Sequence, residues 1–130
     1  SQFDPRVAQR ILKGKNISSS NYAEMVAARA ELVKEVGALD AEIDILLCPT
    51  VPILPPRFAD LEDDASYAKA NLLVLRNPSV ANILDRPSIS LPCNTDKPLP
   101  VGFMLIGQNL QDRYLLSVAR TLEPIIARKD

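Results

Sequence analysis

The sequence contains no histidine, few glycines and no long apolar run. Without histidine, the chain cannot build a Ser-His-Asp or Cys-His catalytic device from its own residues. Its glycines, of which no two are adjacent, form no Gly-Ser-Ser stretch; they stand at positions 14, 37, 102 and 107. No apolar run is long enough to span a bilayer, and no basic start precedes an apolar segment as in a signal peptide. We therefore expect no membrane partner, and any catalysis must use lysine, carboxylates or residues supplied from elsewhere.

Charge of neither sign dominates the sequence. Lys and Arg total 15, Asp and Glu total 16, and the formal net charge is -1. This balance gives no electrostatic reason to expect nucleic acid as a partner. The chain has 130 residues, of which 47% are hydrophobic and 24% charged, values typical of one modest globular domain.

Cysteine is also scarce. Cys48 and Cys93 each stand beside a proline at the end of an apolar run, and they form no Cys-x-x-Cys pair. The spacing favours two buried, reduced thiols in a cytoplasmic protein over a metal site, although a disulfide between neighbouring strands remains open. The acidic run at residues 60–64 has no ordered ligand spacing and is typical of a solvated turn. We expect no metal and no cofactor.

Helical patterns occupy the first third of the chain. Asp4 can cap a short helix whose first position is Pro5. Ser20 or Asn21 is expected to cap the next helix. Apolar residues then keep the helical period to residues 39–42, which predicts the longest helix of the chain.

The strand patterns are short and uncharged or nearly so. Residues 43–48 read as an inner strand buried on both faces. Residues 88–91 alternate small polar and apolar side chains at the strand period. Residues 101–106 form the third strand after a turn at residues 94–100. Gly102 is small enough to let another backbone come close.

The remaining segments are predicted to be helices. A helix at residues 67–75 should break at Asn77-Pro78, and a second short helix can follow at residues 79–84. The last helix should start at Asn109 or Leu110, and Pro124 should end or kink it. The order of helices and strands predicts a mixed α/β class.

Three stretches resemble a known family. They are "DILLCPTVP" (residues 44–52), "NPSVANILDRPSISLPC" (77–93) and "LPVGFMLIGQNLQDRYLLSVARTLE" (99–123). In order and spacing they look like the C-terminal part of an amidase signature enzyme. The resemblance implies an α/β fold with a mixed β-sheet covered by helices. It makes residues 1–130 a single partial domain, with a helical segment at 1–42 and a sheet-forming segment with a C-terminal helix at 43–130.

The resemblance also implies an activity. The family hydrolyses linear amides by acyl transfer with a Ser nucleophile, a second Ser in a cis peptide and a Lys, and its substrates include small-molecule amides. A relative such as the glutamyl-tRNA amidotransferase A subunit transfers the nitrogen instead. Because the Gly- and Ser-rich catalytic segment is missing, no catalytic residue is assigned here. We expect it upstream, outside this chain, which would be inactive alone.

This chain can still shape a substrate pocket. Residues 50–56 form a stiff, proline-rich loop after a strand end, where open α/β sheets usually place ligands. We expect two groups of side chains to line this pocket. The first group is Thr50, Val51 and Pro52, and the second is Asn77 and Asn82. Both asparagines also suit a purely structural role in turns.

Two other interpretations remain. The chain can be a non-catalytic α/β interaction module, or an unrelated enzyme that uses Asp60, Glu62 and Asp63. If it is a fragment, its uncovered strand edges and apolar surface should make the isolated chain self-associate.

Overall fold

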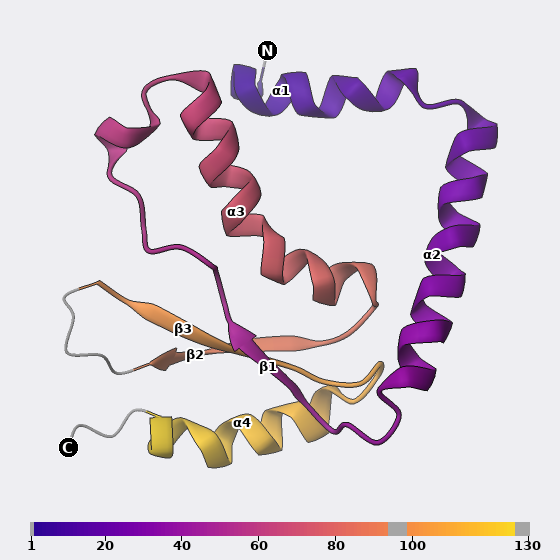
Figure 1. Ribbon diagram of the computed structural model, residues 1–130, viewed down its shortest axis with the longest axis vertical. Helices are drawn as coiled ribbons and strands as arrows, with labels where there is room; N and C mark the ends of the chain where they lie inside the picture. The colour runs from indigo at the N-terminus through magenta and orange to yellow at the C-terminus, as the bar shows by residue number, and fades with distance from the viewer. Residues whose placement is uncertain (1, 94–98, 127–130) are drawn as a thin grey trace.

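A three-stranded sheet with helices on both faces organises the chain (Figure 1), in a computed structural model that describes residues 2–93 and 99–126. The elements follow one another as α1 (Pro5–Leu12), η1 (Lys13–Asn16), α2 (Ser19–Leu39), β1 (Leu46–Pro49), η2 (Phe58–Leu61), α3 (Asp64–Ile83), β2 (Ser88–Cys93), β3 (Val101–Ile106) and α4 (Asp112–Ile126). The strand order is β1-β3-β2, and both strand pairs are antiparallel. The expected α/β class is confirmed.

β3 is the central strand, and its two faces are covered differently. On one face Leu91, Leu105, Leu115 and Ala119 form the core between the sheet and α4. Leu105 has no exposed surface, because both neighbouring strands and α4 enclose it. On the other face, Ala81 of α3 packs with Met104 and Ile106 of β3. α4 and α3 thus lie on opposite sides of the sheet (Figure 1).

The first helices start from side-chain caps. Asp4 accepts a hydrogen bond from the backbone N–H of Arg6 at 2.8 Å, and Pro5 takes the first helical position, as predicted. The cap of α2 is Ser18, whose hydroxyl accepts from the N–H of Asn21 at 3.1 Å. The predicted cap at Ser20 or Asn21 is therefore wrong, because Ser18 comes first in a run of three serines. α2 ends within the predicted range.

α3 contradicts the predicted break at Asn77-Pro78. The helix continues through Pro78 to Ile83 and bends along its length (Figure 1). Pro78 cannot donate to the carbonyl one turn earlier, and the Ser79 hydroxyl bonds instead to the carbonyl of Leu75 at 2.6 Å, a contact that often bends helices. Proline therefore kinks this helix without ending it. Pro124 likewise lies inside α4.

The strands differ most from prediction at β1. The predicted strand at residues 43–48 is shifted to Leu46–Pro49. Leu46 and Cys48 pack against the core beside α3, whereas Leu47 on the opposite face is 54% exposed. Burial on both faces is therefore wrong for this chain, because α4 packs over β2 and β3. β3 has the predicted bounds, and β2 extends the predicted strand to Cys93. Most of the predicted turn, residues 94–98, lies outside the described residues.

A buried ion pair fastens α2 to the sheet. Both guanidinium nitrogens of Arg86, just before β2, donate to the carboxylate of Asp40 at 2.5 and 2.8 Å. The side chains are 4% and 10% exposed. The hydrogen bond from Arg86 holds the pKa of Asp40 below its usual value. Gln108 adds bonds to the carbonyls of Asp40 and Ile43 at 3.1 and 2.8 Å.

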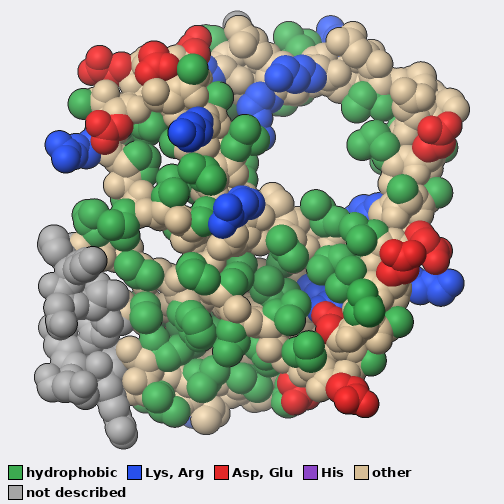
Figure 2. All heavy atoms as spheres, viewed as in Figure 1, with side chains coloured by type: hydrophobic (Ala, Val, Ile, Leu, Met, Phe, Trp, Pro, Cys, Tyr) green, Lys and Arg blue, Asp and Glu red, His purple; other side chains and the backbone are tan. Residues whose placement is uncertain are grey.

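Much apolar surface is left uncovered in the helical part. α1, α2 and α3 surround an opening that the space-filling view keeps open, with apolar side chains along its border (Figures 1 and 2). α2 has no buried residue over 21 positions, although Tyr22, Met25 and Val26 are large and apolar and are 64%, 58% and 51% exposed. In the described ranges, no helix is long and apolar enough to cross a membrane.

Candidate functional site

Three strands converge on Thr50, the first residue after β1. Its backbone N–H donates to the carbonyl of Gly102 at 2.8 Å. Its hydroxyl lies 2.5 Å from the hydroxyl of Ser90 in β2, in a short hydrogen bond. Because Gly102 lies between them on β3 and has no side chain, the two hydroxyls can meet across the central strand. A Cβ on Gly102 would lie 2.5 Å from Thr50 Oγ1 and 2.6 Å from Ser90 Oγ.

α3 contributes a third contact at this strand end. The side-chain amide of Asn77 donates to the carbonyl of Pro49 at 2.7 Å. Asn77 directly precedes Pro78, at the place where the helix loses a backbone hydrogen bond. Thr50 and Asn77, both predicted to line a pocket, are therefore placed at the same end of β1.

The other predicted residues lie at two different places. Val51 and Pro52 line a hollow of about 160 Å³ together with Pro100, Val101 and Gly102, directly beside the Thr50 contacts. Asn82 borders a separate hollow of about 360 Å³ with Ala81, Asp85, Arg86, Pro87, Leu110 and Asp112. The structure thus groups four of the five predicted residues near the end of β1 and leaves Asn82 apart.

The chemistry of this strand end is polar and neutral. It offers two hydroxyls, one amide and backbone groups, which can position a ligand but cannot act as a general base at neutral pH. No Lys or carboxylate of the described residues hydrogen-bonds to Ser90 or Thr50. Nor does any group of three Cys, Asp or Glu residues in the described ranges lie close enough to hold a metal ion.

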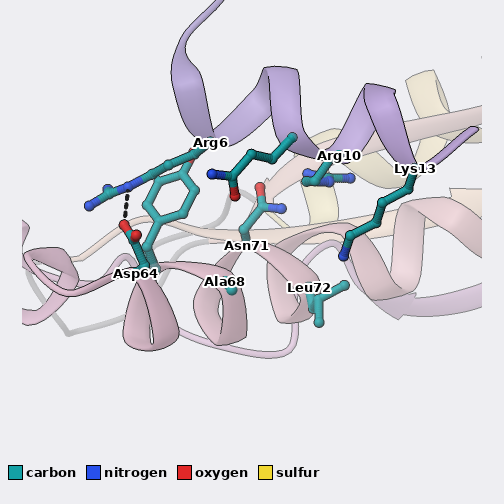
Figure 3. Close-up of a pocket in the computed structure, with 9 residues that line it drawn as sticks. Arg6, Arg10, Lys13, Asp64, Ala68, Asn71 and Leu72 are labelled. Atoms are coloured by element: carbon teal, nitrogen blue, oxygen red, sulfur yellow. Dashed lines mark hydrogen bonds and ion pairs between the residues drawn. The ribbon is translucent and has the colours of Figure 1, made fainter. Parts of the chain in front are cut away.

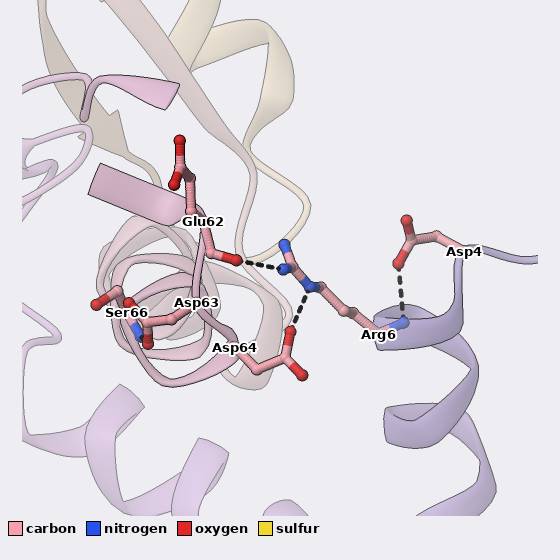
Figure 4. A network of polar contacts seen from close by, with 6 residues as sticks. All are labelled: Asp4, Arg6, Glu62, Asp63, Asp64 and Ser66. Atoms are coloured by element: carbon pink, nitrogen blue, oxygen red, sulfur yellow. Dashed lines mark hydrogen bonds and ion pairs between the residues drawn. The ribbon is translucent and has the colours of Figure 1, made fainter. Parts of the chain in front are cut away.

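The acidic run has structural partners. Asp63 caps α3 by accepting from the N–H of Ser66 at 2.9 Å, and hydrogen bonding by the Ser66 side chain and by this N–H lowers the pKa of the Asp63 carboxyl. Arg6 of α1 donates to Asp64 at 2.7 Å and to the carbonyl of Glu62 at 3.1 Å (Figure 4). Two of the four carboxylates of the run, those of Asp63 and Asp64, therefore cap or join helices. Of the three residues named for the carboxylate enzyme, Asp63 is already engaged in a structural contact.

A third hollow, of about 230 Å³, lies between α1 and α3. Arg6 is already engaged there, stacked 4.5 Å above the ring of Tyr67. Arg10 and Lys13 also line the hollow, and Lys13 points across it toward Leu72 (Figure 3). The positive charges of Arg10 and Lys13 mean that this hollow favours an anionic ligand group over a neutral one.

Sequence reasoning misses some of these contacts. Gly102 is predicted to admit another backbone, but the space beside it holds the hydroxyls of Thr50 and Ser90. Both cysteines are free; Cys48 pairs with Met104 and Cys93 with Val101, on opposite sides of β3. They therefore do not lie on neighbouring strands. The Thr50–Ser90 contact spans 40 positions, and no local pattern signals it.

Comparison with known proteins gives a consistent result. A family model described as Amidase matches residues 1–116. The chain is 30% identical over 128 residues to 2-amino-5-chloromuconic acid deaminase of Comamonas testosteroni, in an alignment that covers 98% of this chain and 28% of that protein. It is 34% identical over 131 residues to the A subunit of glutamyl-tRNA(Gln) amidotransferase from Saccharolobus solfataricus, with coverages of 97% and 27%.

The fold is shared with a solved structure. Allophanate hydrolase of Kluyveromyces lactis superposes with a TM-score of 0.83 at 22% identity, over 95% of this chain and 20% of that one. The chain spans little more than a quarter of the length of the two curated relatives, 28% and 27%. The match to the family model covers most of the chain, and the chain therefore belongs to the amidase family.

Proposed function

We propose that the protein hydrolyses the C–N bond of small linear amides, with its catalytic residues outside this chain. The observation that carries this proposal is the amidase family match over residues 1–116. The family resemblance implies acyl transfer from a Ser nucleophile assisted by a second Ser and a Lys. A free hydroxyl is a poor nucleophile, so such a Ser needs a base, and Lys can serve when its charge is suppressed.

The contribution of this chain is the shape of the pocket. The end of β1 presents Thr50, Val51 and Pro52, and α3 adds Asn77 at the same end. Asn82 borders a different hollow, and the geometry does not support a place for it in this pocket.

The test uses the protein at its full length. Release of ammonia or amine is measured over a panel of aliphatic and aromatic amides, with and without a serine-directed covalent inhibitor. We expect inhibitor-sensitive hydrolysis of at least one amide, and no hydrolysis by residues 1–130 alone. Turnover by the 130-residue chain, or no turnover by the full-length protein, would contradict the proposal.

A second candidate is the transamidating type of activity. It is favoured by the 34% identity to the A subunit of an amidotransferase, a protein whose name refers to glutamyl-tRNA. A hydrolase turns over its amide without a partner, whereas a transamidating enzyme needs one to receive the nitrogen. Amide turnover that depends on added partner subunits would favour the second candidate.

Partners and location remain part of the proposal. The net charge of -1 supports a small-molecule substrate over nucleic acid, and the two free thiols support a reducing, cytoplasmic location. A non-catalytic interaction module is the alternative for a protein that shows no amide turnover at full length.

A further inference from the structure

We propose that Ser90 is a positioning residue for the amide reaction, acting through Thr50 on the direction of the proline-rich segment at residues 50–56. This inference rests on the proposed function and adds a residue to it. Among the described residues no base hydrogen-bonds to Ser90, so its hydroxyl is not activated as a nucleophile. In the part of the chain that the structure describes, the Ser90 hydroxyl has one side-chain partner, the hydroxyl of Thr50 at 2.5 Å.

The junction at Thr50 is fixed from three sides. Gly102 accepts its N–H from the central strand at 2.8 Å, and Ser90 holds its side chain from the far strand. Asn77 holds the preceding carbonyl from α3 at 2.7 Å. We call these contacts the Thr50 clamp. Only the Ser90 contact determines where the Thr50 side chain points, because the other two bind backbone groups.

The direction set at Thr50 is transmitted along the chain. Residues 52, 55 and 56 are prolines, which fix their own backbone φ angles and limit the conformations of the segment. A change of the backbone at Thr50 therefore also moves the residues that follow it directly. Val51 and Pro52, which line the hollow beside the clamp, would move with it.

The neighbouring serine on the same strand provides a matched control. Ser88 lies two positions before Ser90 and therefore on the same face of β2. It pairs with Ile106, whereas Ser90 pairs with Met104. Its side chain has no hydrogen-bond partner among the described residues. Removing its hydroxyl changes the same surface without touching Thr50.

The experiment measures steady-state kinetics on the best amide substrate, in the full-length protein. A neutral hydrogen bond contributes about 0.5–1.5 kcal/mol, so Ser90→Ala and Thr50→Val should each raise KM about 2- to 10-fold. We expect kcat to stay within about twofold, because the chemical groups lie elsewhere. Thr50→Ser, which keeps the hydroxyl, should raise KM less than Thr50→Val does, and Ser88→Ala should resemble the unmodified protein.

The double variant separates a pair from two independent effects. If Ser90 acts through Thr50, then Thr50→Val combined with Ser90→Ala should raise KM no more than either single change. Additive effects, equal effects of Ser88→Ala, or a fall in kcat at unchanged KM would overturn the inference. Melting temperatures measured in parallel identify any variant that fails to fold. If Ser90→Ala fails to fold, the KM values of Thr50→Ser and Thr50→Val are compared, and a higher KM for Thr50→Val supports the inference.

A second readout does not depend on activity. Arg57 is the only Lys or Arg between residues 35 and 68, so trypsin reports on this segment at the Arg57–Phe58 bond. Ser90→Ala should speed this cleavage and Ser88→Ala should not; equal rates would refute the clamp. If the unmodified protein hydrolyses no amide, the proposed function and the role of Ser90 in substrate binding both fail. The trypsin cleavage rates still decide whether Ser90 holds the segment at residues 50–56 in place.

Discussion

Replacing Asp40 by Ala should destabilise the protein more than any other single change of a charged residue in the described ranges. The change leaves the guanidinium of Arg86, 4% exposed, without its carboxylate partner. Removing one member of a buried ion pair leaves an uncompensated charge and typically costs about 3–5 kcal/mol of unfolding free energy. Both bonds of the pair, at 2.5 and 2.8 Å, are lost together.

The surface pair of Lys34 and Glu31 on α2 is the matched control. Its atoms lie 3.6 Å apart and its side chains are 79% and 61% exposed. Solvent screens such a pair, so Glu31→Ala should change the unfolding free energy by less than about 1 kcal/mol. Urea titration of the full-length protein, followed by circular dichroism, measures both variants.

The pH dependence supplies an independent check on Asp40. Its pKa is held below the usual value of 3.8 by Arg86. A carboxyl with a lowered folded-state pKa stabilises the protein above the unfolded pKa, and this contribution is lost as the pH falls through the folded value. The unmodified protein should therefore lose stability below about pH 4, and the Asp40→Ala protein should lose less over that interval.

Two results would refute this reasoning. One is a change for Asp40→Ala no larger than that for Glu31→Ala. The other is a double variant, Asp40→Leu with Arg86→Leu, that is less stable than Asp40→Ala, because removing both charges should relieve the unpaired one. The first result would mean that the pair is solvated in the folded protein, and the second that an unpaired charge does not account for the loss of stability.

Three further predictions concern packing. Leu105→Ala should lower the unfolding free energy by about 2–5 kcal/mol, since the side chain is fully buried; a change below about 1 kcal/mol would show that the core collapses around it. Gly107→Ala should lower the unfolding free energy by about 1–3 kcal/mol, because the new Cβ would lie 3.3 Å from Leu115 Cβ. Gly37→Ala should instead stabilise α2 by up to about 1 kcal/mol, because nothing lies within 4 Å of its new Cβ. A thermal melt in which Gly107→Ala is the more stable of the two variants would contradict both expectations. The isolated 130-residue chain should self-associate through its uncovered helices, and light scattering that finds a compact monomer would count against this.

Local patterns predict the elements that depend on local physics. The cap at Asp4 and the bounds of β3 follow from side-chain hydrogen bonding and from a short uncharged run. The end of α2 is predictable for the same reason. These features need no knowledge of distant residues.

The misses concern contacts that join distant residues. Pro78 stays inside α3, although proline on its own tends to break a helix. In the same turn the Asn77 side chain hydrogen-bonds to the carbonyl of Pro49, and the Ser79 hydroxyl hydrogen-bonds to the carbonyl of Leu75. The Arg86–Asp40 pair spans 46 positions, so neither residue looks unusual in its own segment. Burial of β1 is overestimated because the hydrophobicity of its residues does not reveal that α4 packs over β2 and β3 and leaves Leu47 exposed.

The strand order also affects how the protein is synthesised. β3 pairs with both other strands, yet it is the last of the three to leave the ribosome. About 50 residues separate β1 from β3, so at about 5–20 residues per second β1 waits roughly 3–10 seconds for its partner. During translation β1 and β2 therefore cannot form their pairings with β3 until β3 has been synthesised, and until then the edges that they turn toward β3 are open to chaperones and to other nascent chains.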